Sequence, residues 1–168
     1  ENLEAYDLYL KARSALRVTH QNICRIHEIH TAATDAGAAD FISMEYVDGE
    51  TLFSRWWHEP IPQATALDIA EQLCSGVEAA HSAAILHRDL KSSNVMLARR
   101  PDGALRVVIM DFGLAKTVAG DGMTQTGMMI RTMEDMSPEQ AMGSELDAGS
   151  DICAMGPIRS ELTTGNTP

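Results

Sequence analysis

Acidic and amide side chains in two short segments of this chain have the types and the spacing needed to hold a metal-bound phosphate. Asp89 and Asn94 lie five positions apart in the segment His87–Asn94, and Asp111 begins the segment Asp111–Gly113 about twenty residues later. Transfer of a terminal phosphoryl group requires mainly that groups are positioned and that charge is neutralised. These residue types therefore predict phosphoryl transfer, with Asp89 accepting the proton of an attacking hydroxyl.

The other polar residues of the two segments complete the predicted site. Lys91 would lie beside the transferred phosphate, two residues after the predicted base. The Asn94 amide oxygen and the Asp111 carboxylate would hold Mg²⁺, a hard cation that prefers oxygen ligands. Taken singly, either segment could instead be an ordinary surface turn, because glycine and short polar residues favour turns.

A third motif, the Ser-Pro-Glu of Ser137–Glu139, follows the first two in the order found in protein kinases. On these motifs the chain resembles the bacterial serine/threonine protein kinases with the eukaryotic-type fold, from about Leu10 to its last residue. The resemblance implies ATP and Mg²⁺ as cofactors and protein substrates as partners. Lys91, two residues after Asp89, is similar to the serine/threonine branch, which implies Ser or Thr as the acceptor.

A nucleotide-contacting segment is implied by the same resemblance. Phe41–Gly49 is similar to the fifth strand and hinge of the family, with Met44 at the gatekeeper position behind the adenine. Glu45 and Val47 would offer backbone hydrogen bonds to the base. Met44, Glu45 and Val47 are therefore expected to bind ATP together with Lys91 and the two metal ligands.

The segment between the second and third motifs corresponds to the activation segment of the family. It contains Thr124 and Thr126. We hypothesise that phosphate on either threonine pairs bidentately with Arg88 and orders the segment. The alternative is a flexible polar loop whose threonines have no regulatory role.

The predicted fold class is α+β, with a protein-kinase-like fold. Residues 1–47 are expected to form a partial small lobe, with a helix C over Leu3–Val18 and two or more antiparallel strands. Residues 48–168 are expected to form the hinge and an incomplete, mainly helical large lobe. The sequence shows neither a Gly-rich phosphate loop nor the strand lysine that grips the inner phosphates, so we expect a truncated catalytic domain.

Hydrophobic patterns give the bounds of the expected elements. Ile23–Ile29 and Phe41–Val47 are predicted as neighbouring strands, and Val95–Leu97 and Leu105–Met110 as a hairpin. A long helix is predicted to begin near Pro62. The side chains that recur at three- and four-residue steps along it are Leu67, Ala70, Leu73, Cys74, Val77 and His81.

The last expected helix contains residues that conflict with helical packing. Asp151 matches the aspartate that, in the family, anchors the catalytic loop from this helix. Pro157 removes a backbone donor, at a cost of about 3 kcal/mol in a helix interior. Arg159 and Thr163 stand where apolar residues are expected.

Composition excludes several partner classes. The net charge is −11, from 13 basic and 24 acidic residues, which disfavours nucleic acid because that affinity depends on phosphate neutralisation. Three widely spaced cysteines favour neither a disulfide framework nor a zinc site. No apolar run approaches the roughly 20 residues of a membrane helix. We expect a cytoplasmic location, either alone or as the cytoplasmic part of a membrane-anchored kinase.

Two classes of function remain open. The first is transfer of the ATP γ-phosphate to Ser or Thr hydroxyls of protein substrates. The second is a degenerate or truncated kinase-like module that binds nucleotide or protein partners without phosphoryl transfer. The intact residues Asp89, Asn94 and Asp111 favour the first class, and the missing phosphate-binding lysine favours the second.

Overall fold

The computed structural model describes residues 18–34, 37–112 and 147–164; the predictions for helix C and for Thr124 and Thr126 lie outside these ranges. The elements in chain order are β1 (Ile26–Thr34), β2 (Gly37–Met44), β3 (Gly49–Thr51), α2 (Leu52–His58), α3 (Gln63–Ser82), the short 3₁₀ helix η1 (Ser92–Asn94), β4 (Val95–Arg99), β5 (Leu105–Ile109) and α5 (Ala148–Thr164).

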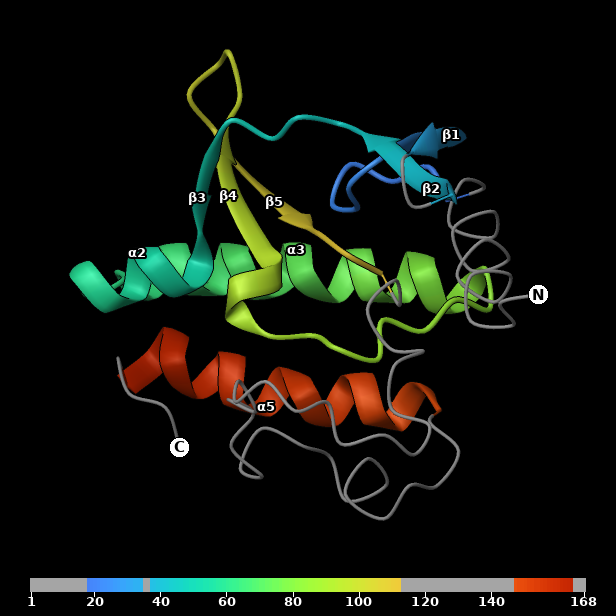
Figure 1. Cartoon of the computed structure of the whole chain (residues 1–168). Helices are drawn as coiled ribbons and strands as arrows, with labels where there is room; N and C mark the ends of the chain where they lie inside the picture. The colour runs from blue at the N-terminus through green and yellow to red at the C-terminus, as the bar shows by residue number, and fades with distance from the viewer. Residues whose placement is uncertain (1–17, 35–36, 113–146, 165–168) are drawn as a thin grey trace, which may run out of the picture.

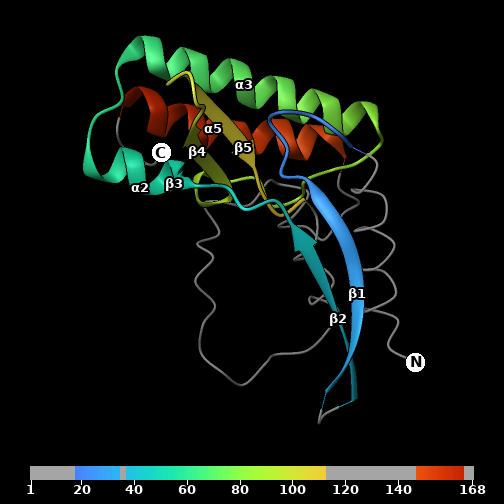
Figure 2. The same ribbon diagram turned by 90° about the horizontal axis from the view of Figure 1, so that it is seen from above.

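Helices and strands form a helical body with two small antiparallel sheets (Figure 1). The sheet with strand order β3-β4-β5 packs on α3, and α5 runs beside α3. The β1–β2 hairpin extends away from the helices, as the view from above shows (Figure 2). The chain crosses from β2 to β3 through residues 45–48, so this connection joins the hairpin to the helical body.

The main hydrophobic core lies between α3, β5 and α5. Ile69 and Leu73 of α3 and Ile109 of β5 are almost completely buried, and Ile158 and Leu162 of α5 close the core from the other side. Burial of such aliphatic side chains stabilises a fold by about 1.5–3 kcal/mol each. The core therefore fixes the two helices and the sheet that carry the candidate site.

The predicted long helix is present as α3, with Pro62 at its N-cap. Its buried face differs from the prediction, because Leu67 is 59% exposed and Cys74 is exposed as well. The face that packs against β5 and α5 consists of Ala66, Ile69, Leu73, Gly76, Val77 and Ala80. These positions also follow three- and four-residue steps, so helical periodicity alone did not separate the two faces.

The bounds predicted for the first strand were wrong at its start. β1 begins at Ile26 and pairs antiparallel with β2, with a register from Ile26 opposite Met44 to Thr34 opposite Gly37. Ile23 instead forms a parallel bridge with Ile109 at the end of β5. Ile23 is buried in the main core, and this burial accounts for its departure from the hairpin.

The predicted hairpin is confirmed as β4 and β5, which pair from Val95 opposite Ile109 to Arg99 opposite Leu105. Gly103 in the turn has φ of 84°, a left-handed conformation that glycine adopts without steric cost. The Asp102 side chain accepts a hydrogen bond from the Ala104 N–H at 2.9 Å. The residue types of this turn therefore predict its geometry correctly.

The short strand β3 was not predicted. It pairs with β4, and a Cβ at Gly49 would lie 2.2 Å from the Leu97 carbonyl oxygen, so only glycine allows this close approach. Thr51 then caps α2, since its hydroxyl accepts a hydrogen bond from the Ser54 N–H at 3.1 Å. Trp56 of α2 faces the core while Trp57 is 67% exposed.

Helix α5 continues through Pro157 without ending there. Cys153, whose carbonyl loses its helical donor to the proline, is exposed, so this carbonyl lies on the face next to water. Arg159 and Thr163 are exposed too, and the conflict foreseen at these positions is avoided because they face solvent. None of the helices in the described ranges has both the length and the apolar character needed to cross a membrane.

Candidate active site

The segment His87–Asn94, here called the catalytic loop, is anchored by a buried aspartate of α5. The backbone N–H groups of His87 and Arg88 donate to the two oxygens of Asp151, each at 2.7 Å. Asp151 is 1% exposed, and its Oδ2 also lies 2.8 Å from Nε2 of His81 on α3. The predicted anchor thus joins the loop to both long helices.

The ring of His87 links the catalytic loop to the strand end before Asp111. Its Nε2 lies 2.8 Å from the Met110 carbonyl oxygen, and its Nδ1 accepts from the Asp89 N–H at 3.2 Å. These two bonds require the neutral ring with the proton on Nε2. Burial lowers the pKa of His87, which keeps this neutral form.

The predicted base has the other two predicted catalytic residues as neighbours. Lys91 Nζ lies 3.4 Å from Asp89 Oδ2. The Asn94 amide nitrogen donates to the Asp89 carbonyl at 2.8 Å and lies 3.4 Å from Oδ2 of the same residue. Because the amide nitrogen faces Asp89, the amide oxygen of Asn94 remains for another donor or a cation.

Asp111 follows the catalytic loop closely in space. The N–H of Met110 donates to the Asn94 carbonyl at 2.8 Å. Asp111 is the next residue after Met110, so this bond holds it close to Asn94. Asp111 has φ of 53°, a conformation that is unfavourable for a residue with a Cβ and often occurs at functional sites. Phe112 is buried against His87, with the centroids of the two rings 4.8 Å apart, while Asp111 is exposed.

The donor set at this point suits a magnesium–nucleotide complex. An Asn94 amide oxygen and an Asp111 carboxylate are hard oxygen ligands, and Mg²⁺ usually binds one or two such protein groups together with phosphates. Within residues 18–34, 37–112 and 147–164, no three His, Cys, Asp or Glu side chains gather as a metal-binding group. Asn94 and Asp111 by themselves supply the one or two protein oxygens that an ion bound together with phosphates requires.

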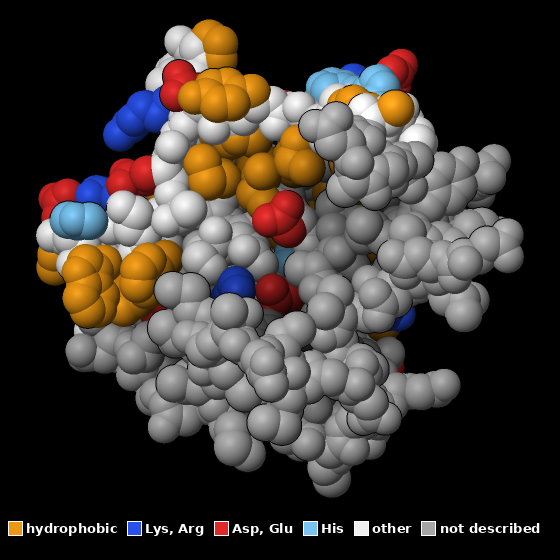
Figure 3. Space-filling model, viewed as in Figure 1, with side chains coloured by type: hydrophobic (Ala, Val, Ile, Leu, Met, Phe, Trp, Pro, Cys, Tyr) orange, Lys and Arg blue, Asp and Glu red, His pale blue; other side chains and the backbone are white. Residues whose placement is uncertain are grey.

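A cavity lies between the end of β2 and Asp111. Cys24, Met44, Asp111 and Phe112 are among the residues that line it. Apolar side chains gather near the middle of the face in Figure 3, with acidic and basic side chains close below them. Burial raises the pKa of the Cys24 thiol to about 11, so the thiol stays protonated at neutral pH.

Residues Met44–Val47, here called the hinge, connect β2 to the approach to β3. The Glu45 N–H donates to the Arg25 carbonyl at 2.8 Å, and the Glu45 carbonyl is 3.7 Å from the Cys24 sulfur. Val47 is buried, yet its N–H and C=O make no backbone–backbone hydrogen bond with any described residue.

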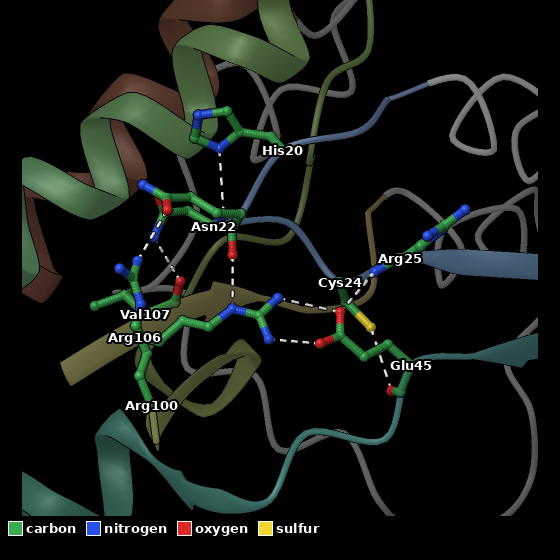
Figure 4. Close-up of polar contacts among 9 residues, drawn as sticks. His20, Asn22, Cys24, Arg25, Glu45, Arg100, Arg106 and Val107 are labelled. Atoms are coloured by element: carbon green, nitrogen blue, oxygen red, sulfur yellow. Dashed lines mark hydrogen bonds and ion pairs between the residues drawn. The ribbon is translucent and has the colours of Figure 1, made fainter. Parts of the chain in front are cut away.

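Arg106 of β5 contacts the hinge at the candidate site, and the sequence analysis did not identify it. Its guanidinium bonds both oxygens of the Glu45 carboxylate, and its Nε donates to the Gln21 carbonyl at 2.9 Å (Figure 4). The Glu45 side chain thus turns toward Arg106, and hydrogen bonding from Arg106 lowers the pKa of Glu45. No motif in the sequence signals this pairing, because it joins residues 61 positions apart.

The regulatory hypothesis is outside the part of the chain that the structure describes. The backbone of Arg88 is held by Asp151, with φ of 65°, and its side chain is half-buried. Thr124 and Thr126 fall within residues 113–146, of which nothing is described. Pairing of a phosphothreonine with Arg88 stays a prediction.

Comparison with known proteins places this site in a family. The family model described as "Protein kinase domain" matches residues 10–168. "Serine/threonine-protein kinase PknB" of Mycobacterium leprae is 36% identical over 160 residues, which are 94% of this chain and 25% of that protein. "Serine/threonine-protein kinase pkn3" of Myxococcus xanthus is 39% identical over 165 residues, 94% of this chain and 29% of that protein. The chain spans less than a third of either relative.

Solved structures show the same fold. The crystal structure of a mutant of the Mycobacterium tuberculosis PknI kinase domain matches with a TM-score of 0.74 and 23% identity, covering 100% of this chain and 60% of that one. Rad53 residues 1–466 in complex with AMP-PNP match with a TM-score of 0.72 and 23% identity, covering 96% of this chain and 38% of that one. Because the family model matches residues 10–168, the chain belongs to the protein kinase domain family.

Proposed function

We propose that this chain carries the catalytic machinery of a serine/threonine protein kinase, which transfers the γ-phosphate of ATP to Ser or Thr hydroxyls of protein substrates. The most direct support is that Lys91 and Asn94 both lie close to the Asp89 carboxylate. A backbone hydrogen bond from Met110 to Asn94 brings the strand end before Asp111 to the same place. In this proposal residues 1–47 belong to the small lobe, which ends with the hinge residues Met44–Val47, and residues 48–168 to the rest of the hinge connection and the large lobe.

The residues have separate roles in this reaction. The substrate hydroxyl oxygen forms a bond to the γ-phosphorus, the bond from that phosphorus to the bridging oxygen breaks, and ADP leaves. Asp89 orients the hydroxyl and takes its proton late in the step. Lys91, 3.4 Å from that carboxylate, neutralises charge that builds on the phosphoryl oxygens.

Metal binding in the proposed reaction rests on Asn94 and Asp111. Mg²⁺ held by their oxygens would neutralise the phosphate charge. Met44 would border the adenine, and the backbone of Glu45 and Val47 would bind it. The exposed, unpaired thiols of Cys74 and Cys153 suit a reducing compartment, so we place the activity in the cytoplasm.

The test is incorporation of labelled phosphate from ATP into a generic protein substrate in the presence of Mg²⁺. The Asp89→Asn variant should lose about 10²- to 10⁴-fold in rate, because it cannot accept the proton. Asp102→Asn is the matched control, since Asp102 lies in the β4–β5 turn and asparagine keeps the oxygen that accepts from Ala104. The control should retain full activity.

Other outcomes separate this proposal from the binding-module alternative. Thermal stabilisation by Mg-ATP without incorporation would select a module that binds nucleotide but transfers no phosphate. Equal incorporation by the wild type and by Asp89→Asn would remove the base from its proposed role. If Mg-ATP gives no thermal stabilisation and no phosphate is incorporated, both functions are rejected.

A further inference from the structure

Arg106 joins three segments that are distant in the sequence (Figure 4). It extends from β5, its Nη1 and Nη2 contact the Glu45 carboxylate of the hinge, and its Nε donates to the Gln21 carbonyl. A planar guanidinium can make these contacts together because its donors lie in a fixed fork. A single side chain thus ties the hinge to the β4–β5 hairpin and to the segment before β1.

Glu45 is held on several sides at once. Its backbone N–H donates to the Arg25 carbonyl at 2.8 Å, and the Arg25 N–H lies 3.5 Å from its Oε2. Two residues later Val47 is buried against Cys24 and Val108. The hinge backbone is therefore fixed at both ends, while the intervening Tyr46 is 87% exposed.

The ion pair is partly removed from water. The side chains of Arg106 and Glu45 are 25% and 26% exposed. Bidentate arginine–carboxylate pairs in such surroundings are stronger than ordinary surface pairs. Lysine would supply the charge but neither the fork nor the simultaneous bond to Gln21.

Among the described residues, the Arg106 guanidinium bonds Glu45 and Gln21 and none of the predicted catalytic or metal-binding groups. It stands five residues before Asp111, which along an extended strand is roughly 16 Å at about 3.3 Å per residue. Its influence must therefore pass through the hinge. The hinge groups that would bind adenine are the backbones of Glu45 and Val47. Arg106 holds Glu45 through the carboxylate of the Glu45 side chain.

We propose that Arg106 is a positioning residue for the nucleotide, which fixes the hinge through Glu45 so that the hinge backbone meets the base in one arrangement. This inference rests on the proposed nucleotide site. It assigns Arg106 to affinity and not to the rate of phosphoryl transfer. Its loss should let the hinge fluctuate, so that binding has to order it.

The first test measures the Kd of Mg-ATP by calorimetry and the KM and kcat of substrate phosphorylation. Arg106→Met should raise Kd and KM about 3- to 10-fold and leave kcat within about twofold. Arg106→Lys should recover part of the affinity, since it restores one charge without the fork. Arg99→Met is the matched control, because the Arg99 side chain of β4 has one hydrogen bond among the described residues, to the Gly103 carbonyl in the neighbouring turn.

A double-mutant cycle then asks whether Arg106 acts through Glu45. Glu45→Ala should raise Kd about as much as Arg106→Met, and the double variant should raise it little further. Additive effects of the two substitutions on Kd would contradict the proposed route. A fall in kcat with an unchanged Kd for Arg106→Met would overturn the positioning role.

Hydrogen exchange in the nucleotide-free chain separates this inference from the proposed function. The backbone amide of Glu45, which donates to the Arg25 carbonyl, should exchange faster in Arg106→Met than in the wild type and the Arg99→Met control. Unchanged exchange in Arg106→Met and Arg106→Lys would overturn the inference even if the wild type is an active kinase. Failure of the wild type to bind Mg-ATP, with faster hinge exchange in Arg106→Met, would reject the proposed function and the adenine role but support the tie to the hinge.

Discussion

The catalytic loop and the hinge are both short connections at the candidate site, and they are held by different kinds of interaction. The loop receives its support from Asp151, a carboxylate that is 1% exposed and accepts from two backbone N–H groups. The hinge is held by the Glu45–Arg106 pair, in which each side chain is about a quarter exposed. One support is buried and the other is partly exposed to water.

This difference determines how each region responds to change. Backbone N–H groups that lose a buried acceptor bear the full desolvation penalty, about 1–3 kcal/mol per group. A partly exposed pair can exchange its contacts for water, so its loss affects local order more than folding. The loop is thus expected to be rigid as long as the fold persists, while the hinge can be adjusted without unfolding the chain.

The largest expected effect comes from removing the loop's anchor. Asp151→Ala should lower the free energy of unfolding by about 3–5 kcal/mol, because the His87 and Arg88 N–H groups and the His81 ring lose their acceptor. Urea denaturation followed by circular dichroism measures this. Asp147→Ala is the control at the start of the same helix, where loss of the bond to Gly149 should cost about 1 kcal/mol. Equal losses in the two variants would contradict the comparison.

A smaller effect is expected where the hinge passes into β3. Gly49→Ala should destabilise by about 2 kcal/mol, because the added Cβ would meet the Leu97 carbonyl and separate β3 from β4. Gly156→Ala is a suitable control, since a Cβ there meets nothing within 4 Å and alanine favours helix α5. Melting temperatures of both variants provide the measurement. A Gly49→Ala variant as stable as the wild type would contradict this prediction and show that β3 and β4 can move apart without loss of stability.

The smallest expected effect is the pH dependence of the loop's support. Burial lowers the pKa of His87, so below about pH 6.5 the unfolded chain binds a proton that the folded chain excludes. Stability from this residue is complete above that pH and is lost as the pH falls from about 7.5 to about 5.5. Urea denaturation at the two pH values tests this against His87→Phe, which should lack that part of the decrease. The same decrease in both proteins would mean that His87 does not carry it.

Sequence reasoning reached the catalytic loop because its chemistry is local. Asp89, Lys91 and Asn94 are so close in the chain that a short loop brings them together, and the β4–β5 hairpin that leads to Asp111 has a clear turn signal. The structure adds the His87 ring and the Met110 backbone as the link between the two segments. The residue types of the site could thus be predicted, although the link between its two halves could not.

Long-range pairing explains the errors. Ile23 fits the alternating pattern of a hairpin strand, but it bridges to Ile109 because the main core offers more complete burial. Leu67 fits a helical stripe, yet α5 and β5 cover a different face of α3. Arg106 is one charged residue of a strand, and only the fold shows that Glu45 lies within its reach.

Met110 has a further consequence for how this site can diversify. It contributes to the loop through main-chain atoms alone, since its N–H bonds Asn94 and its carbonyl bonds the His87 ring. Any residue except proline could supply both bonds. The Met110 side chain packs against the buried cluster that contains Cys24 and Val108, so exchanges among apolar residues at position 110 could reshape the neighbourhood of Asp111 without rebuilding the backbone that supports it.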